Sequence, residues 1–168
     1  VRHFVNRNPS VFGSDIDADN VRWCAASLPG KYIRNDLFPR LDFDDSHFGL
    51  VYAISVFTHL DQDAANAWRD EIHRVLRPRG IAIFTIHGST GIGRILDDRR
   101  LNLLASNGFD ASSPDARLDK HIEDRTYYRA TFQSAHSVRQ FFGQRFRVID
   151  QIVGANALLQ DFVVLEKR

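Results

Sequence analysis

Short apolar segments alternate with amphipathic ones along the first half of the chain. The segments at residues 48–57 and 81–86 are almost continuously apolar, a pattern typical of strands that are covered on both faces. A third strand is expected at residues 10–16. Apolar residues at helical spacing predict helices at residues 17–28 and 61–76. This alternation of strands and helices favours an open, mostly parallel sheet.

The remaining segments give weaker patterns. Residues 32–33 suggest one more short strand, and residues 39–46 are polar and punctuated, which indicates a loop. After Gly88 we expect a helix at residues 92–105, an irregular stretch at 110–131, a helix at 134–142 that is capped by Ser134, and two closing strands at 146–153 and 161–166. The closing strands are expected to be antiparallel neighbours.

Length and composition indicate one globular domain. The chain has 168 residues, 43% of them hydrophobic and 26% charged, with a formal net charge of +1. This balance argues against a nucleic-acid or acidic membrane surface as the partner. No segment approaches the ~20 apolar residues that cross a bilayer. A single cysteine, Cys24, excludes an intrachain disulfide, and we expect a cytoplasmic protein.

Polar residues follow each of the predicted strands. Asp15 ends the first, Asn35-Asp36-Leu37 follow the second, residues 55–60 follow the third, and His87 follows the fourth. In open α/β sheets, ligands bind outside the carboxyl ends of the strands. A carboxylate in such a position offers two acceptor oxygens to the hydroxyls of a ribose. These residues are therefore the candidate site.

Several segments in this order resemble the motifs of class I S-adenosylmethionine-dependent methyltransferases. They are VFGSDIDADNVRWC, LDFDDSHFGLVYAISVFTHL, WRDEIHRVLRPRGIAIFTIHG and, less specifically, YYRATFQS with LLQDFVVLEK. The resemblance implies an α/β fold of three αβα layers, a Rossmann-like sheet that is mostly parallel with an antiparallel last strand. It divides the domain into a cofactor-binding half (1–88), an acceptor-side insert (89–134) and a closing helix and strands (135–168).

The resemblance also assigns cofactor-binding residues. Asp15, followed by Ile16, would bind the ribose hydroxyls of S-adenosylmethionine. Asp36 and the backbone of Leu37 would flank the adenine. Two residues after the third strand, Ser55 and Val56, would lie along the methionine end of the cofactor. The acceptor is expected to be a small or glycan-like molecule.

One part of the family pattern is missing from this sequence. No Gly-x-Gly-x-Gly loop precedes the first predicted strand, and residues 1–5 resemble the helix that follows that loop. Because the chain begins with Val1 and contains no methionine, we expect it to be trimmed from a longer one. The absent strand would be the central one, between the strands at residues 10–16 and 48–57. We therefore expect one of three arrangements: direct pairing of these two strands, a partner chain such as a second copy at the open sheet, or a longer natural chain that supplies the strand.

Two histidines and two tyrosines are the candidate catalytic and acceptor-side residues. His59 and His87 follow strands, where either could act as a general base or make a structural hydrogen bond. Tyr127 and Tyr128 would line the acceptor pocket or pack in the core. The seven histidines lack metal-ligand spacing, so no metal is expected. The sequence also lacks a Gly-x-Ser-x-Gly nucleophile elbow.

Two other functions are compatible with the sequence. A truncated, non-catalytic methyltransferase-like module would bind a partner through its open sheet. A glycine-rich segment, Gly88 to Gly93, superficially resembles the phosphate loop of an NAD(P)-dependent oxidoreductase. That loop belongs after the first strand of a nucleotide-binding unit, whereas only two predicted strands follow this one. Methyl transfer is therefore the favoured function.

Overall fold

The structure is a computed structural model that describes residues 10–95, 97–115, 118, 127–154 and 160–168. Its first half contains β1 (Phe12–Asp15), α2 (Ala18–Ser27), β2 (Lys31–Arg34), β3 (Phe48–Ala53), α3 (Gln62–Val75) and β4 (Leu76–Ile86). Its second half contains α4 (Ser89–Ile92), α5 (Asp98–Asn107), β5 (Phe109–Pro114), β6 (Arg129–Gln133), α6 (Ala135–Gly143), β7 (Phe146–Ile152) and β8 (Asp161–Lys167).

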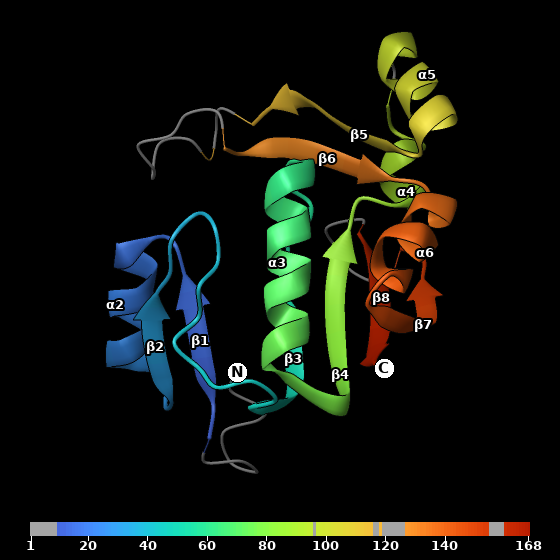
Figure 1. The fold of residues 1–168 in the computed structure, drawn as a ribbon. Helices are drawn as coiled ribbons and strands as arrows, with labels where there is room; N and C mark the ends of the chain where they lie inside the picture. Colours follow the sequence, from blue (N-terminus) through green and yellow to red (C-terminus); the bar gives the residue numbers. More distant parts are fainter. Residues whose placement is uncertain (1–9, 96, 116–117, 119–126, 155–159) are drawn as a thin grey trace.

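Three groups of paired strands make up the described sheets (Figure 1). β1 and β2 are parallel, and β3, β4, β8 and β7 form a four-stranded sheet in that order. β3 and β4 are parallel, whereas β8 is antiparallel to both β4 and β7. β5 and β6 pair antiparallel. The α/β fold and the antiparallel last strand are therefore confirmed.

β1 and β3 lie at neighbouring edges without pairing. β1 pairs only with β2 and β3 only with β4 among the described strands. The two strands meet at their amino ends, where the ring of Phe12 lies 5.1 Å from that of Phe43 and 5.6 Å from that of Phe48. Direct pairing of these two strands, one of the expected outcomes, is thus wrong for the described residues. The order of the strands agrees instead with a missing central neighbour.

The core lies between the four-stranded sheet and the two helices α3 and α6. Trp68 and Ile72 of α3 and Phe142 of α6 are buried against Phe84 of β4. The rings of Phe84 and Phe57 are 4.6 Å apart and tilted, a favourable arrangement for aromatic pairs. Every one of these side chains comes from a segment with a clear apolar pattern. The sequence thus encodes this part of the core locally.

The prediction that the strand at residues 48–57 is covered on both faces is wrong. β3 ends at Ala53, and two side chains on its second face, Leu50 and Tyr52, are 39% and 40% exposed. Val51 and Ala53 pack toward the core. The described helices and strands therefore cover only one face of β3. The apolar sequence could not reveal this, because apolar side chains occur both in the core and at the surface.

Helix ends agree well with the sequence. The Asp17 carboxylate accepts hydrogen bonds from the backbone N–H groups of Asp19 and Asn20, at 2.8 and 3.3 Å, and so caps α2. Ser134 caps α6 by accepting from the N–H of Ser137. Gly108, in the left-handed conformation with φ of 69°, ends α5. The cap at Ser134 confirms the predicted start of α6, and α2 lies within the predicted range of residues 17–28.

The region after β4 differs from the prediction in two respects. The expected helix at residues 92–105 is divided into α4 and α5, because Asp97 caps a new helix with its carboxylate. The stretch at 110–131, expected to be irregular, contains β5 and the start of β6. The sequence RATFQ alternates polar and apolar residues, a strand signal that the expectation of an irregular stretch missed. The sequence FDASSP is mostly polar after Ala111 and gives no such signal.

The β5–β6 hairpin is attached to the carboxyl ends of the sheet strands. The N–H groups of Arg129, Thr131 and Gln133 donate to the carbonyls of His59, Thr58 and His87, at 2.9, 2.9 and 3.0 Å. Figure 1 shows the hairpin crossing above α3 and the end of β4. The hairpin therefore closes the edge at which the sequence places the candidate site.

Candidate functional site

Asp15 lies at the carboxyl end of β1 and is partly buried. Its Oδ1 accepts a hydrogen bond of 2.9 Å from the N–H of Asp17, and its Oδ2 lies 3.4 Å from the side-chain nitrogen of Asn20. The carbonyl of Ile16 accepts from the guanidinium of Arg34, the last residue of β2. The turn after β1 is thus fixed by short-range hydrogen bonds. Among the described residues, Oδ2 has one hydrogen bond and it is long, so this oxygen is the one better suited to a ligand hydroxyl.

The loop after β2 is held by two buried side chains. The carbonyl of Leu37 accepts hydrogen bonds from Trp68 Nε1, at 3.2 Å, and from the Tyr127 hydroxyl, at 2.7 Å. Tyr127 is only 6% exposed, and burial raises the pKa of its hydroxyl. Tyr127 therefore lies in the core and supports the Asp36–Leu37 loop. Of the two tyrosines proposed for the acceptor pocket, only Tyr128 remains in a suitable place.

Ser55 adopts an unusual backbone conformation just after β3. Its φ of 57° lies in the left-handed region, which non-glycine residues rarely adopt. Its N–H donates to Thr85 Oγ1 at 2.7 Å, and its hydroxyl is hydrogen-bonded to the side chain of Gln160. Val56, the next residue, is 37% exposed. The surrounding strands thus hold this turn at the carboxyl edge.

His59 and His87 lie together under β6. Their rings are 6.1 Å apart and perpendicular. Nδ1 of His59 lies 3.3 Å from the carbonyl of Arg129, and Nδ1 of His87 lies 3.1 Å from that of Thr131. A carbonyl can only accept, so each Nδ1 donates its proton to the carbonyl, and in a neutral ring the lone pair is then on Nε2.

Asp115 and Tyr128 lie beside His59. The buried carboxylate of Asp115 lies 3.7 Å from His59 Nδ1, and the ring of Tyr128 lies 6.2 Å from that of His59. Burial lowers the pKa of His87, which keeps its ring neutral near pH 7. Sequence reasoning missed Asp115, because it follows an unpatterned segment and is brought to His59 only by the hairpin.

The segment from Gly88 to Gly93 forms the short helix α4, and its start is already occupied. The buried Asp161 carboxylate accepts from the N–H of Ser89 at 3.0 Å. A Cβ atom at Gly88 would lie 2.0 Å from an oxygen of that carboxylate, so the glycine permits this close contact. An internal carboxylate takes the place that a cofactor phosphate would need. The oxidoreductase alternative is therefore wrong on structural grounds.

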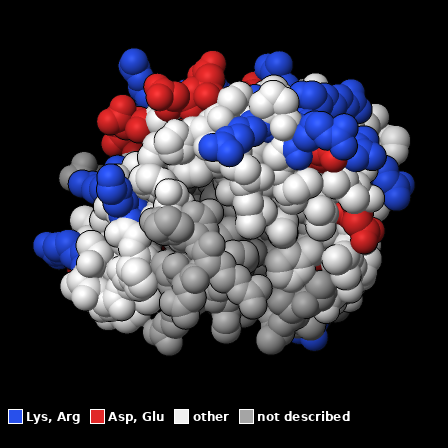
Figure 2. Space-filling view, turned by 90° about the horizontal axis from the view of Figure 1, so that it is seen from below, with Lys and Arg blue, Asp and Glu red and all other residues white. Residues whose placement is uncertain are grey.

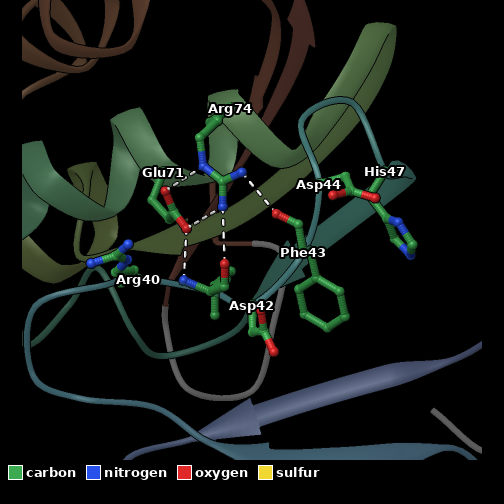
Figure 3. Close-up of a pocket in the computed structure, with 8 residues that line it drawn as sticks. Arg40, Asp42, Phe43, Asp44, His47, Glu71 and Arg74 are labelled. Atoms are coloured by element: carbon green, nitrogen blue, oxygen red, sulfur yellow. Dashed lines mark hydrogen bonds and ion pairs between the residues drawn. The ribbon is translucent and has the colours of Figure 1, made fainter.

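The larger of two described cavities, about 600 Å³, lies at the opposite, amino end of β3 (Figure 3). Arg74 dominates it and donates to Glu71, to Asp45 and to the carbonyls of Leu41 and Phe43. These bonds consume the donors of the guanidinium and hold the loop before β3 in place. Arg74 therefore has a structural role in this cavity, which lies at the end of β3 opposite to the candidate site.

Charged side chains of both signs lie on the molecular surface. Both basic and acidic side chains lie along the rim of the face in Figure 2. Within the described part of the chain, no group of three or more His, Cys, Asp or Glu residues is arranged to hold a metal ion. None of the described helices is long and apolar enough to span a membrane.

Comparisons with known proteins identify the family. A profile described as a methyltransferase domain matches residues 1–84, half of the chain. The chain belongs to this methyltransferase family. None of the curated proteins matches it.

Solved structures show the same fold at low sequence identity. An S-adenosylmethionine-dependent methyltransferase from Methanosarcina mazei is 16% identical, with a TM-score of 0.65; the match covers 94% of this chain and 82% of that one. One from Mesorhizobium loti is 13% identical, with a TM-score of 0.63 and coverages of 95% and 81%. A Burkholderia thailandensis 1,6-didemethyltoxoflavin-N1-methyltransferase, solved with S-adenosylhomocysteine, is 12% identical, with a TM-score of 0.67 and coverages of 99% and 64%.

Two of these similar structures are S-adenosylmethionine-dependent methyltransferases and a third was solved with S-adenosylhomocysteine, so S-adenosylmethionine is the cofactor against which the described residues are compared. The described residues fit its adenosine half, because a carboxylate ends β1 and a fixed loop follows β2 at the same edge. For the methionine half the sequence offers no Gly-x-Gly-x-Gly loop before β1. The described residues that fit the cofactor are therefore those that follow β1 and β2.

Proposed function

We propose that this methyltransferase transfers a methyl group to a nucleophilic oxygen, nitrogen or carbon of a small or glycan-like acceptor beneath the β5–β6 hairpin. The paired histidines carry this proposal. His87 directly follows β4, and its Nδ1 donates to a carbonyl of the hairpin, so that Nε2 is the basic nitrogen of its neutral ring. The ring of His59 lies 6.1 Å from it. A hydroxyl or ammonium acceptor loses a proton when it is methylated, so a base at this place is useful.

Cofactor binding is proposed to involve the residues at the strand ends. Asp15 would accept hydrogen bonds from the ribose hydroxyls, with Ile16 beside it, and Asp36 and the Leu37 backbone would flank the adenine. Ser55 and Val56 would lie along the methionine end. Bound S-adenosylmethionine supplies an activated methyl group on its sulfonium. The protein then contributes mainly proximity and alignment, which explains the absence of an obligatory catalytic dyad in the sequence.

Calorimetry with S-adenosylhomocysteine tests this assignment. Asp15→Asn keeps an acceptor for the Asp17 N–H but loses the charge, so we expect at least tenfold weaker binding. Asp44→Asn, which changes an exposed carboxylate in the loop before β3, is the matched control and should bind as the parent protein does. Equal affinity of all three proteins would remove Asp15 from the site.

A second candidate function is a non-catalytic binding module. It is supported by β1 and β3, each of which pairs on one side only among the described strands. A partner chain or a second copy would pair with these edges. Absence of calorimetric heat with millimolar S-adenosylhomocysteine, together with a concentration-dependent molecular mass, would favour this function over methyl transfer. A cytoplasmic location remains a prediction from sequence.

A further inference from the structure

A second cavity, of about 470 Å³, lies between α4, α5 and the β5–β6 hairpin. Its lining includes two arginines, Arg94 and Arg100, together with Ser113 of β5 and Phe132 of β6. Nothing in the sequence patterns singled out these residues. They come from the acceptor-side insert rather than from the cofactor-binding half.

Arg100 is held rigidly in this cavity. Its Nε donates to the fully buried Asp110 carboxylate at 2.6 Å, and its Nη2 donates to the carbonyl of Ala130 at 2.9 Å. Its guanidinium carbon lies over the Phe132 ring, 4.8 Å from the centroid. Nη1 makes no hydrogen bond to a described residue. A fixed guanidinium with a remaining donor is preorganised for an oxyanion.

Arg94 adds a second positive charge that no described side chain neutralises. Its exposed guanidinium has no hydrogen bond or ion pair with the described residues. Asp97 is the acidic residue in the lining, and its carboxylate accepts from the N–H groups of Arg99 and Arg100 at the start of α5. Asp97 therefore caps the helix, and both arginines keep donors for a ligand.

The cavity adjoins His87. The Phe132 ring contacts Arg100 and also stacks against the His87 ring, with centroids 4.9 Å apart. Gly91, which lines the cavity, lies so close to both rings that an added Cβ would be 3.0 Å from His87 Cβ and 3.4 Å from Phe132. A molecule in the cavity would thus be separated from His87 only by the residues Gly91 and Phe132 of the cavity wall.

We propose that this cavity binds an oxyanion of the acceptor, a carboxylate or a phosphate monoester, and that Arg94 determines specificity for it. The proposal rests on the methyl-transfer function, because it takes the molecule beside His87 to be the acceptor. Arg94 and Arg100 supply planar donor edges that match either group, and Ser113 supplies a hydroxyl. The neutral remainder of the acceptor would extend toward the histidine pair.

The test is an NMR titration of the ¹⁵N-labelled protein with benzoate, phenyl phosphate and the neutral analogue benzamide. We expect saturable shifts of the Gly91 and Ser113 amide signals with one or both anions, and the tighter of the two identifies the preferred oxyanion. Benzamide should bind at least tenfold more weakly, because it lacks the charge. Equal binding of benzamide, or no shift with either anion at tens of millimolar, would overturn the proposal.

Variants make the test specific to Arg94. Arg94→Gln should weaken anion binding by roughly tenfold or more, and Arg94→Lys should restore part of it. Arg99→Gln removes an exposed arginine of α5 outside the cavity and should have no effect. Equal losses in the Gln variants would indicate non-specific charge attraction and refute the site. Calorimetry with S-adenosylhomocysteine is the separate measurement: anion binding without cofactor binding would refute methyl transfer and leave the anion site standing.

Discussion

The sheet half and the β5–β6 hairpin are held in different ways, although both contribute to the same edge. β3 and β4 bury apolar side chains against α3 and α6, and these side chains form the core. The hairpin is fixed instead by backbone hydrogen bonds to the ends of those strands and by Thr131, whose hydroxyl donates to the carbonyl of Leu60 at 2.6 Å. The apolar pattern of the sheet half is visible in the sequence, whereas the hairpin is held by hydrogen bonds to segments far away in the chain.

This difference has a functional consequence. The ends of the strands are set by the core and present Asp15, Ser55 and His87 at one edge. The hairpin then orients both imidazoles through its carbonyls and brings Asp115 beside them. Loosening the hairpin should therefore disturb the histidines without unfolding the sheet, as expected when regions of one protein differ in local stability.

The largest effect is expected in the core. Phe84→Ala removes a fully buried ring that contacts those of Phe57 and Phe142, and should lower the free energy of unfolding by about 3–5 kcal/mol. Phe38→Ala, at a phenylalanine that is 56% exposed, should change it by less than about 0.5 kcal/mol. Urea denaturation measures both. Similar losses for the two variants would contradict the assigned core.

A smaller and more local effect is expected in the hairpin. Thr131→Val keeps the side-chain shape but removes the hydroxyl that bonds Leu60, so unfolding should become easier by about 1–2 kcal/mol. Hydrogen exchange should accelerate at the β6 amides and remain unchanged at β4. Thr131→Ser retains the hydroxyl and is the control. Uniform acceleration in both strands would show that the hairpin and the sheet open as one unit.

The smallest effect concerns pH. Burial lowers the pKa of His87, so in acid the unfolded chain binds a proton at this residue before the folded protein does. The neutral His87 ring therefore contributes to stability at pH values above the pKa of this residue in the unfolded chain, about 6.5. This contribution is lost as the pH falls toward the lower pKa that His87 has in the folded protein. His87→Asn should reduce the loss of stability over this window. Burial also lowers the pKa of His73. Because His73 is present in both proteins, its contribution to the pH dependence of stability cancels when the two are compared. A parallel pH dependence of the two proteins would contradict this role of burial.

Sequence reasoning located most of the candidate site because strand ends are local features. Asp15, Asp36, Ser55 and His87 could be placed from apolar segments and the polar residues after them. Tyr127 could not be distinguished from Tyr128, since adjacent side chains diverge and only packing shows that one enters the core. Asp115 and Arg94 gave no pattern, because each becomes notable only through neighbours far away in the chain.

The amino-acid sequence by itself determined the alternation of elements, the caps at Asp17 and Ser134 and the membership of a methyltransferase family, since these depend on residue spacing and short motifs. Only the tertiary structure decided that β1 and β3 do not pair directly, that the hairpin covers the strand ends, and that Asp161 occupies the start of α4. These features rest on hydrogen bonds between distant segments. Such bonds are specified by the geometry of the assembled sheet rather than by any local run of residues.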